Sequence, residues 1–367
     1  MSVKAREVTR LIERLAPLEL AEDWDNVGWQ VGDPDALIQS VLVTLDFTPA
    51  VLEEARREKA DLIITHHPFL FKPLRQVRYD QLSGQLLREL VQNRIMLYSA
   101  HTNLDNAPEG VSQVLGERLG LNNLHVFGSN RQEKLYKLVV FVPEGHEDEV
   151  RQAVSEAGAG WIGNYSHCTF QIPGTGTFLP REGTSPFIGQ QGKLEKVAEY
   201  RLETIVPERI LNSVVQAMIE AHPYEEVAYD VYPLHLSGQS LGPGRLGILQ
   251  EPMKLGELIE QVKQVLRIAA VRVIGDPSRL VQKVAVCGGS GAFLIPAAAS
   301  SGAEVLITGD VKYHEAQEAA NRGLAIIDAG HQATELPAVE FLSDYLQKRL
   351  PSVKFIVAEP FRVESWL

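Results

Sequence analysis

Residues 61–68 of the chain read DLIITHHP, a short apolar run that ends in two adjacent histidines. The DLIIT portion is typical of a strand buried on both faces, and His66 and His67 follow it directly. The pattern continues on both sides, with strand patterns at 40–45 (SVLVTL) and 95–99 (IMLYS) and helix patterns at 49–59 and 84–93. Because short apolar strands alternate with helices, this part of the chain predicts a parallel or mixed α/β sheet.

A second α/β segment lies near the end of the chain, after a segment of different order. Its strand patterns lie at 283–286, 304–308 and 325–328, and its helix patterns at 255–266, 295–301, 314–321 and 334–348. From about residue 126 the order is instead strand, helix, strand, strand, helix, strand, as in a ferredoxin-like split βαβ unit. We therefore expect an α/β core split between residues 1–128 and 237–367, with an α+β domain inserted at 129–236; three consecutive domains are the alternative. The glycine-rich stretch 237–247 is expected to be a linker.

The composition is that of an ordinary globular protein. Of the 367 residues, 45% are apolar and 22% are charged, which is outside the range of disordered chains. The 35 basic and 47 acidic residues give a formal net charge of −12, which disfavours nucleic acids and anionic membranes as partners. Cys168 and Cys287 lie far apart, and no apolar run approaches the ~18 residues of a membrane span. We expect a soluble cytoplasmic protein without a disulfide framework or a structural zinc knuckle.

Polar clusters follow the carboxyl ends of several predicted strands, where ligand crevices form in open α/β sheets. These clusters are THHP at 65–68, AHTNLD at 100–105, TGD at 308–310 and DAGH at 328–331, the last leading to Glu335. They offer imidazoles and carboxylates but no thiolate, a set that suits Zn, Mn, Fe, Ni or Co. A surface or capping role is the alternative for the His66–His67 pair taken alone. For His331 and Glu335, spaced i, i+4, the alternative is a solvated helix face.

The spacing of these residues favours two metal ions. Adjacent histidines on an extended backbone point in roughly opposite directions, so His66 and His67 would each face a different ion. A carboxylate of Glu335 or Asp105 that bridges the two would complete a two-metal centre with ions about 3.5–4 Å apart. His101 and Asp105 are also spaced i, i+4, although a loop or single turn is favoured there.

Three further features each have a functional and a structural interpretation. Asp310 and His314 form another i, i+4 pair, in which Asp310 either supports a metal ligand or caps a helix. The run 288–291 (GGSG) either cradles a phosphate or forms a tight strand-to-helix turn. The run 24–28 (WDNVG) either floors a substrate pocket or plugs a loop with its aromatic ring.

Several of these motifs together resemble one family. WDNVGWQVG (24–32), THHP (65–68), HTNLD (101–105), LITGDVKYHEAQ (306–317) and DAGHQATE (328–335) are similar to motifs of the GTP cyclohydrolase I type 2 homolog family, also called NIF-three-like di-metal proteins. The resemblance implies metal ligation by His66, His67, Asp105, His331 and Glu335. It implies that Glu335 bridges while the two adjacent histidines serve different ions. It places His101 beside the site.

The resemblance also covers the middle of the chain, which is similar to the PII-like or CutA-like insertion of longer bacterial members. His222–Glu226 (HPYEE) resembles the HPYE motif of CutA-type domains, with a helix-to-strand turn as the structural interpretation. We expect assembly or regulation, rather than chemistry, from this segment. The family resemblance further implies a homo-oligomer, a toroidal hexamer with metal sites facing an internal cavity.

The activity implied by the resemblance is metal-dependent hydrolysis. Two divalent ions per chain are expected, zinc first and Fe, Mn, Ni or Co as alternatives. The family name implies opening of the purine ring of GTP to give formate and a dihydroneopterin triphosphate, so we expect a small nucleotide-like or phosphorylated substrate. His101 or His314 would carry protons, since imidazole titrates near neutral pH. A metal-dependent phosphoesterase and a non-catalytic, metal-binding regulatory scaffold are the alternatives.

Overall fold

The structure is a computed structural model that describes residues 2–129 and 131–359. The chain forms two compact units: unit 1 combines Met1–Arg131 with Leu241–Leu367, and unit 2 is Gln132–Ser240. Both units mix helices with sheets, so the predicted mixed α/β fold is confirmed. Among the described residues, no helix combines the length and apolar character needed to cross a membrane.

Unit 1 contains a five-stranded sheet in the order β17-β4-β5-β6-β2. Four of its strands are parallel, and β2 pairs with β6 in the antiparallel sense. The strands are β2 (Gly28–Val31), β4 (Ser40–Thr44), β5 (Leu62–Thr65), β6 (Met96–Ser99) and β17 (Lys354–Val357). Every residue of β4, β5 and β6 is buried, as their continuous apolar character predicts.

Helices of the N-terminal half connect or flank these strands. They are α1 (Ala5–Leu15), a 3₁₀ turn (Leu18–Leu20), α2 (Pro49–Glu58), α3 (Leu82–Asn93), α4 (Thr102–Asn106) and α5 (Val111–Arg118). Local chemistry fixes their ends: the Thr48 hydroxyl accepts a hydrogen bond from the N–H of Val51 at 3.3 Å, and Pro49 occupies the first turn of α2. A short ribbon of β1 (Val3–Lys4) and β3 (Leu37–Ile38) adjoins α1.

Unit 1 also contains a six-stranded sheet in the order β13-β16-β15-β14-β12-β7. Its strands are β7 (Asn122–Phe127), β12 (Gly244–Lys254), β13 (Arg272–Ile274), β14 (Leu280–Val286), β15 (Val305–Thr308) and β16 (Ala325–Asp328). Its helices are α8 (Leu255–Leu266), a 3₁₀ turn (Ala292–Leu294), α9 (Ile295–Ser300), α10 (Tyr313–Asn321) and α11 (His331–Arg349). Strands β14, β15 and β16 are parallel, so their carboxyl ends share one edge.

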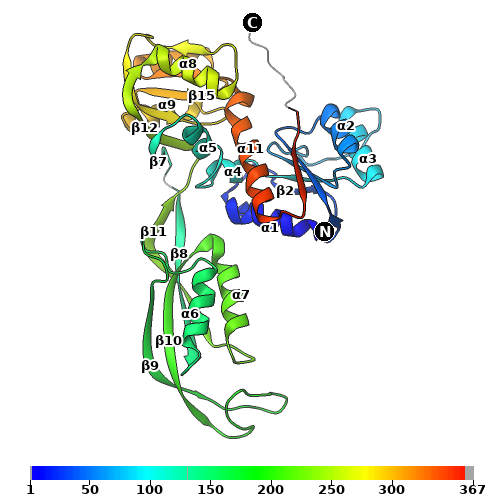
Figure 1. Ribbon diagram of the computed structural model, residues 1–367, viewed down its shortest axis with the longest axis vertical. Coiled ribbons are helices and arrows are strands. Elements are labelled where there is room, and N and C mark those ends of the chain that lie inside the picture. The colour runs from blue at the N-terminus through cyan, green and yellow to red at the C-terminus, as the bar shows by residue number, and fades with distance from the viewer. Residues whose placement is uncertain (1, 130, 360–367) are drawn as a thin grey trace. The chain divides into compact units, whose positions relative to one another are not determined.

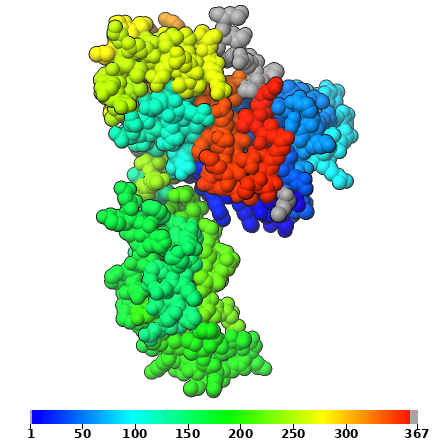
Figure 2. Space-filling model, viewed as in Figure 1, coloured from blue at the N-terminus to red at the C-terminus, as the bar shows by residue number. Residues whose placement is uncertain are grey.

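The two halves of the chain exchange strands between these sheets. β7, from the N-terminal half, completes the six-stranded sheet, whereas β17, from the C-terminal end, pairs with β4 in the five-stranded sheet. Figure 1 shows β17 in red beside the blue strands. Helix α11 links β16 to β17 and contacts α5 as well as β4. In Figure 2 this helix, in orange, lies between the cyan segment around α5 and the blue segment of the first sheet.

The stretch 237–247, predicted as a linker, spans the boundary between the two units at Ser240 and Leu241, but most of it is strand rather than loop. Strand β11 runs to Ser240 and β12 begins at Gly244, so most of the stretch is paired in sheets. Glycine serves close packing here: a Cβ on Gly244 would lie 2.6 Å from the ring of Phe127 on the neighbouring strand β7. Composition alone did not predict these strands, because it does not distinguish a glycine in a flexible loop from a glycine that lets a neighbouring side chain pack closely.

Unit 2 has the order strand, helix, strand, strand, helix, strand. Its elements are β8 (Gln132–Pro143), α6 (Glu147–Glu156), β9 (Thr169–Phe178), β10 (Glu195–Pro207), a 3₁₀ turn (Glu208–Ile210), α7 (Leu211–Ala221) and β11 (Tyr229–Ser240). The strands form an antiparallel sheet in the order β11-β8-β10-β9, and α6 and α7 pack on it over an apolar core. This is the ferredoxin-like arrangement.

Candidate metal centre

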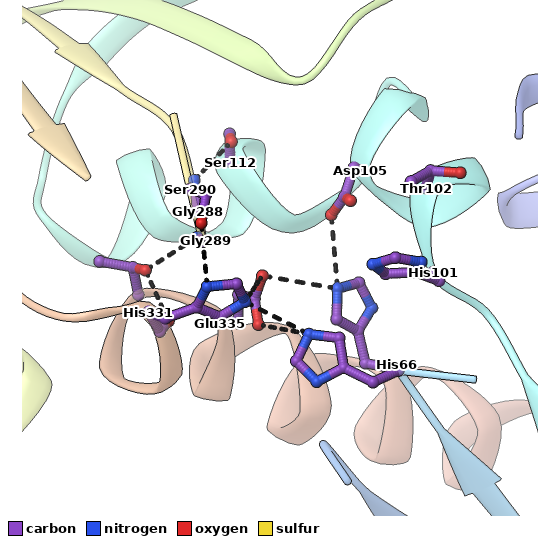
Figure 3. A network of polar contacts seen from close by, with 12 residues as sticks. His66, His101, Thr102, Asp105, Ser112, Gly288, Gly289, Ser290, His331 and Glu335 are labelled. Carbon is purple, nitrogen blue, oxygen red and sulfur yellow. Dashed lines mark hydrogen bonds and ion pairs between the residues drawn. The ribbon is translucent and has the colours of Figure 1, made fainter. Parts of the chain in front are cut away.

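The carboxyl ends of strands from both sheets of unit 1 meet at one cluster of polar side chains (Figure 3). His66 and His67 follow β5, and Asp105 lies in α4 after β6. His331 is the first residue of α11, just after β16, and Glu335 lies one turn further along that helix. The structure thus brings together the five residues that the sequence pointed to as metal ligands.

Glu335 is buried at the centre of this cluster, with 4% of its surface exposed. Its Oε1 lies 3.1 Å from Nε2 of His331 and 3.7 Å from Nε2 of His66. Its Oε2 lies 3.2 Å from Nε2 of His67, which in turn lies 3.3 Å from Nε2 of His331. Asp105 extends the cluster, because its Oδ1 is 3.5 Å from Nε2 of His66. One carboxylate therefore touches three imidazoles that come from two sheets.

These spacings suit a metal ion. Two donor atoms at ~2.0–2.1 Å from a tetrahedral ion lie about 3.3–3.4 Å apart, and the contacts of the cluster are 3.1–3.7 Å. Donor atoms gather within 4.8 Å of one another in two overlapping groups, His66–His67–His101 and His67–His331–Glu335. The buried Nε2 of His66 has no hydrogen-bond partner within the described part of the chain. Since an unpaired buried nitrogen is costly, a bound cation would remove that cost.

The imidazoles of His66 and His67 are each oriented by a hydrogen bond on the side away from Glu335. His66 donates from Nδ1 to the carbonyl oxygen of Ala100 at 2.8 Å, and His67 donates from Nδ1 to Oδ1 of Asp46 at the same distance. Each hydrogen bond fixes the ring and leaves Nε2 as the nitrogen that faces the cluster. Metal-ligating histidines are commonly held in this way.

His331 is oriented by Asp310, whose Oδ2 accepts from its Nδ1 at 2.7 Å; Asp310 also accepts from the hydroxyl of Ser290. Burial opposes ionisation of Asp310, but these two hydrogen bonds hold its pKa below the usual value. Asp310 has a φ of +56°, a left-handed conformation that is uncommon outside glycine. It does not cap the following helix, because the N-cap of α10 is Lys312. Of the two interpretations of Asp310, the structure favours orientation of the candidate ligand His331 over helix capping.

His101 lies beside the cluster and is oriented by Asp25. Its Nδ1 is 2.9–3.0 Å from the two carboxylate oxygens of Asp25, and its ring centroid is 5.1 Å from that of His66. The side chain of Asp25 is fully buried and also accepts from the backbone N–H of Thr102 at 3.1 Å. Burial would raise the pKa of this carboxyl, but hydrogen bonds from His101 and Thr102 hold it well below its usual value. Asp25 is therefore a fixed anion that positions His101.

His314 is placed differently. It is exposed in the first turn of α10, and its ring contact is with the neighbouring Tyr313, at 5.3 Å between centroids. Within the described residues it takes no part in the polar contacts that join the cluster.

The imidazoles and carboxylates shift each other's pKa. Burial opposes protonation of His67, but its hydrogen bonds to Asp46 and Glu335 outweigh this and raise its pKa to about 10. The hydrogen bond to Glu335 raises the pKa of His331 to about 9 against the effect of burial. Burial would raise the pKa of Glu335, but the charge of His66 and the hydrogen bond from His331 hold it well below its usual value. A metal ion entering this site must displace protons from imidazoles.

The GGSG run at 288–291 packs over Glu335 as a tight turn. Gly289 has a φ of +65°, and a Cβ there would lie 2.3 Å from Oε1 of Glu335. The N–H groups of Gly288, Gly289 and Gly291 donate to the hydroxyls of Ser112, Thr334 and Thr308, respectively. These N–H groups are therefore not available to a phosphate, and the turn interpretation of this run is the one that the structure favours.

The WDNVG run is not a buried plug. Trp24 is 61% exposed, and its ring lies 6.1 Å from that of His101 and 5.9 Å from that of Phe71, which is 43% exposed. The exposed ring of Trp24 thus adjoins His101 beside the polar cluster, and the exposed ring of Phe71 lies next to Trp24.

Residues 3–361 match the Duf34/NIF3 (NGG1p interacting factor 3) family. The chain belongs to this family. Proteins called GTP cyclohydrolase 1 type 2 homolog in Halalkalibacterium halodurans and Bacillus subtilis are 45% and 43% identical to it, over 95% and 91% of this chain and 93% and 90% of theirs. A crystal structure of a Bacillus cereus protein related to NIF3 has a TM-score of 0.88 at 42% identity, and the match covers 100% of this chain and 99% of that one. The resemblance seen in the motifs is thus confirmed at the level of the family.

The sequence analysis did not assign the positioning roles of Asp46 and Asp25, although it quoted Asp25 within the run 24–28. Asp46 follows strand β4, so the pattern that selected His66 and His67 would have found it at the end of the neighbouring strand. The role of Asp25 had no such signal, because this residue lies in an irregular loop and its contact with His101 is long-range in sequence.

Proposed function

We propose that this Duf34/NIF3 protein holds two divalent metal ions per chain and hydrolyses a small nucleotide. The observation that carries the proposal is the central position of Glu335, whose Oε1 contacts His66 and His331 and whose Oε2 contacts His67. In this proposal His66 and Asp105 serve one ion, His67 and His331 serve the other, and Glu335 bridges. A donor set of imidazoles and carboxylates fits zinc first, with Fe, Mn, Co or Ni as alternatives.

Two divalent ions at such a site supply Lewis-acid activation of water and of the attacked atom. The chain supplies orientation and proton transfer. Asp310 and Asp46 fix the imidazoles of His331 and His67, so little reorganisation is needed when charge develops. His101 adjoins the cluster and is held through Nδ1 by Asp25; its Nε2, which makes no hydrogen bond within the described residues, could exchange a proton with substrate. We assign the proton-carrying role to His101 rather than to the exposed His314.

The substrate we propose is GTP, with hydrolytic opening of its purine ring. The names of the Halalkalibacterium halodurans and Bacillus subtilis relatives suggest this reaction. The exposed rings of Trp24 and Phe71 support a substrate with a planar base, because stacking on aromatic faces is worth ~1–3 kcal/mol per base. A simple phosphoester would gain nothing from these rings.

The test is turnover of GTP by metal-loaded protein, with formate and phosphate followed separately. We expect formate release that falls by orders of magnitude in His331→Ala and more modestly in His101→Ala. Glu340→Gln is the matched control, since Glu340 is a half-exposed residue of the same helix α11 that pairs with Arg118 at 2.9 Å. Phosphate without formate would replace the cyclohydrolase by a phosphoesterase. Neither product from GTP, other nucleotides or phosphoesters, with both ions bound, would favour a regulatory metal-binding scaffold.

A further inference from the structure

Unit 2 contains a cavity of about 730 Å³, formed wholly by its own residues. Its walls come from β9, from β10, from the 179–194 segment that connects these strands, and from the turn that precedes β11. Pockets that take small organic molecules have volumes of roughly 300–1,000 Å³. The cavity is therefore large enough for a ligand of that kind, and the metal centre of unit 1 contributes nothing to its lining.

Aromatic rings gather on one side of this cavity. The ring of Tyr224 lies 5.9 Å from that of Phe178 and 6.3 Å from that of Phe187, measured between centroids. Phe187 is 55% exposed, so its ring is accessible to a ligand in the cavity. The faces of aromatic rings carry partial negative charge and attract cations within about 6 Å.

A buried carboxylate lies beside these aromatic rings. Glu199 lines the cavity with only 9% of its surface exposed and accepts a hydrogen bond from the hydroxyl of Tyr224 at 3.0 Å. Its Oε2 lies against the backbone of Gly176, where an added Cβ would come within 2.0 Å. In the described residues no lysine, arginine or histidine pairs with Glu199. Buried carboxylates are normally paired with a cation, so this one lacks the partner that burial calls for.

The cationic residues of the lining do not fill that role. Arg201 is half-exposed and pairs with Glu203 at 2.9 Å, and Arg181 is exposed on the connecting segment. The connecting segment is held in place from the other side, because the N–H of Ser185 donates to the carboxylate of Glu225 at 2.9 Å. The buried charged group of the cavity is therefore the carboxylate of Glu199. The segment that connects β9 and β10, which forms the rim, is held by a hydrogen bond to Glu225.

We propose that this cavity binds a small organic cation, with an ammonium group between Glu199 and the rings of Tyr224, Phe178 and Phe187 and an apolar body in the remaining space. The HPYE motif at 222–225 would then do more than form a turn. Its Tyr224 contributes a ring to the proposed cation site, and its Glu225 accepts the hydrogen bond that holds the connecting segment. A primary or quaternary ammonium compound fits this chemistry; a carboxylate or phosphate ligand does not.

The test titrates the full-length protein with three probes, followed by ligand-observed and protein-observed NMR. Choline is the cation, 3,3-dimethylbutan-1-ol is its neutral carbon isostere, and benzyltrimethylammonium adds an apolar body. We expect choline to bind at least 10-fold more tightly than the isostere, and benzyltrimethylammonium more tightly than choline because it fills more of the cavity. Equal binding of choline and its isostere, or no saturable binding of either cation at millimolar concentrations, overturns the proposal.

Variants locate the site. Glu199→Gln keeps the shape and an acceptor for Tyr224 but removes the charge, and should weaken choline binding at least 10-fold. Glu220→Gln is the matched control, because Glu220 is an exposed residue of α7 outside the lining, accepts a hydrogen bond from Gln216, and should leave choline binding unchanged. Phe187→Ala removes a ring that is 55% exposed and lies outside the buried apolar core of unit 2, so it tests the aromatic side of the site even if Glu199→Gln fails to fold. Unchanged choline binding in Phe187→Ala and in folded Glu199→Gln refutes the assignment.

Discussion

Replacing Glu335 by alanine should empty both metal positions, whereas replacing either neighbouring histidine should affect mainly one. Glu335 contacts the Nε2 atoms of three imidazoles at 3.1–3.7 Å, so its carboxylate is shared by the two proposed ions. His66 and His67 lie on different sides of that carboxylate. The expected order of metal loss is therefore Glu335→Ala first, and His66→Ala or His67→Ala after it.

The magnitude follows from the number of ligand contacts removed. Loss of a residue that merely orients a ligand typically costs 10–100-fold in metal affinity. Loss of a direct ligand should cost at least the upper end of that range, about 100-fold or ~2.8 kcal/mol, for each ion. Because Glu335 would bind both ions, its removal should weaken the binding of each ion by this amount. His66→Ala should weaken the binding of one ion.

The assay is metal content by mass spectrometry in protein purified without chelator, followed by titration of stripped protein with Zn²⁺. Glu335→Gln serves as a second variant that preserves side-chain shape, and Glu340→Ala on the outer face of α11 controls for helix perturbation. Near-ultraviolet circular dichroism checks that each variant retains its fold. A folded Glu335→Ala protein that still binds two ions with wild-type affinity would refute the bridging assignment.

Three further predictions follow from the same contacts. Asp310→Asn should weaken one metal position by 10–100-fold, because the carboxylate that orients His331 at 2.7 Å is lost; a zinc titration equal to wild type contradicts this. Metal binding near pH 7 should release protons and tighten as the pH rises toward 10, because the pKa of His67 is raised to about 10 and that of His331 to about 9; identical calorimetric heats in buffers of different ionisation enthalpy count against it. Replacing residues 132–240 by a short Gly/Ser linker should leave a folded protein with both metal positions, because the N–H of Leu241 donates to the carbonyl of Arg131 at 2.9 Å; loss of metal from the folded deletion assigns unit 2 to the site.

The positions of the clustered residues were predictable from the sequence, because strand direction decides them. A parallel strand places whatever follows it at the carboxyl edge of its sheet, and β5 and β16 are apolar enough to be recognised as strands without other information. His66, His67 and His331 follow from that rule alone. The rule also reaches Asp46 after β4, where the side chain orients His67.

Which sheet each strand joins was not predictable, because pairing depends on contacts between distant segments. The sequence indicated strands in both halves but not two sheets that exchange them. The last strand, β17, pairs with β4 from the start of the chain, and the polar strand β7 carries too weak a pattern to be recognised. The Gly244–Lys254 strand was hidden for a different reason, since its glycines admit neighbouring side chains and so resemble a linker.

The exchange of strands explains how the clustered residues from opposite ends of the chain hold fixed distances. Helix α11 carries His331 and Glu335 away from the six-stranded sheet and delivers the chain to β17 in the five-stranded one, so it is anchored at both ends. A second tie runs in the other direction through Arg245 of β12, which is 2% exposed. Its guanidinium donates to the carbonyl of Ala107 at 2.6 Å, directly after the helix that carries Asp105, and to the carbonyl of Gly242 at 2.6 Å. Burial lowers the pKa of Arg245 to about 10, so it still carries its charge at neutral pH. Two connections between the sheets, one covalent through α11 and one through the hydrogen bonds of Arg245, thus hold Asp105 and Glu335 at a fixed separation, as the proposed bridging role of Glu335 requires.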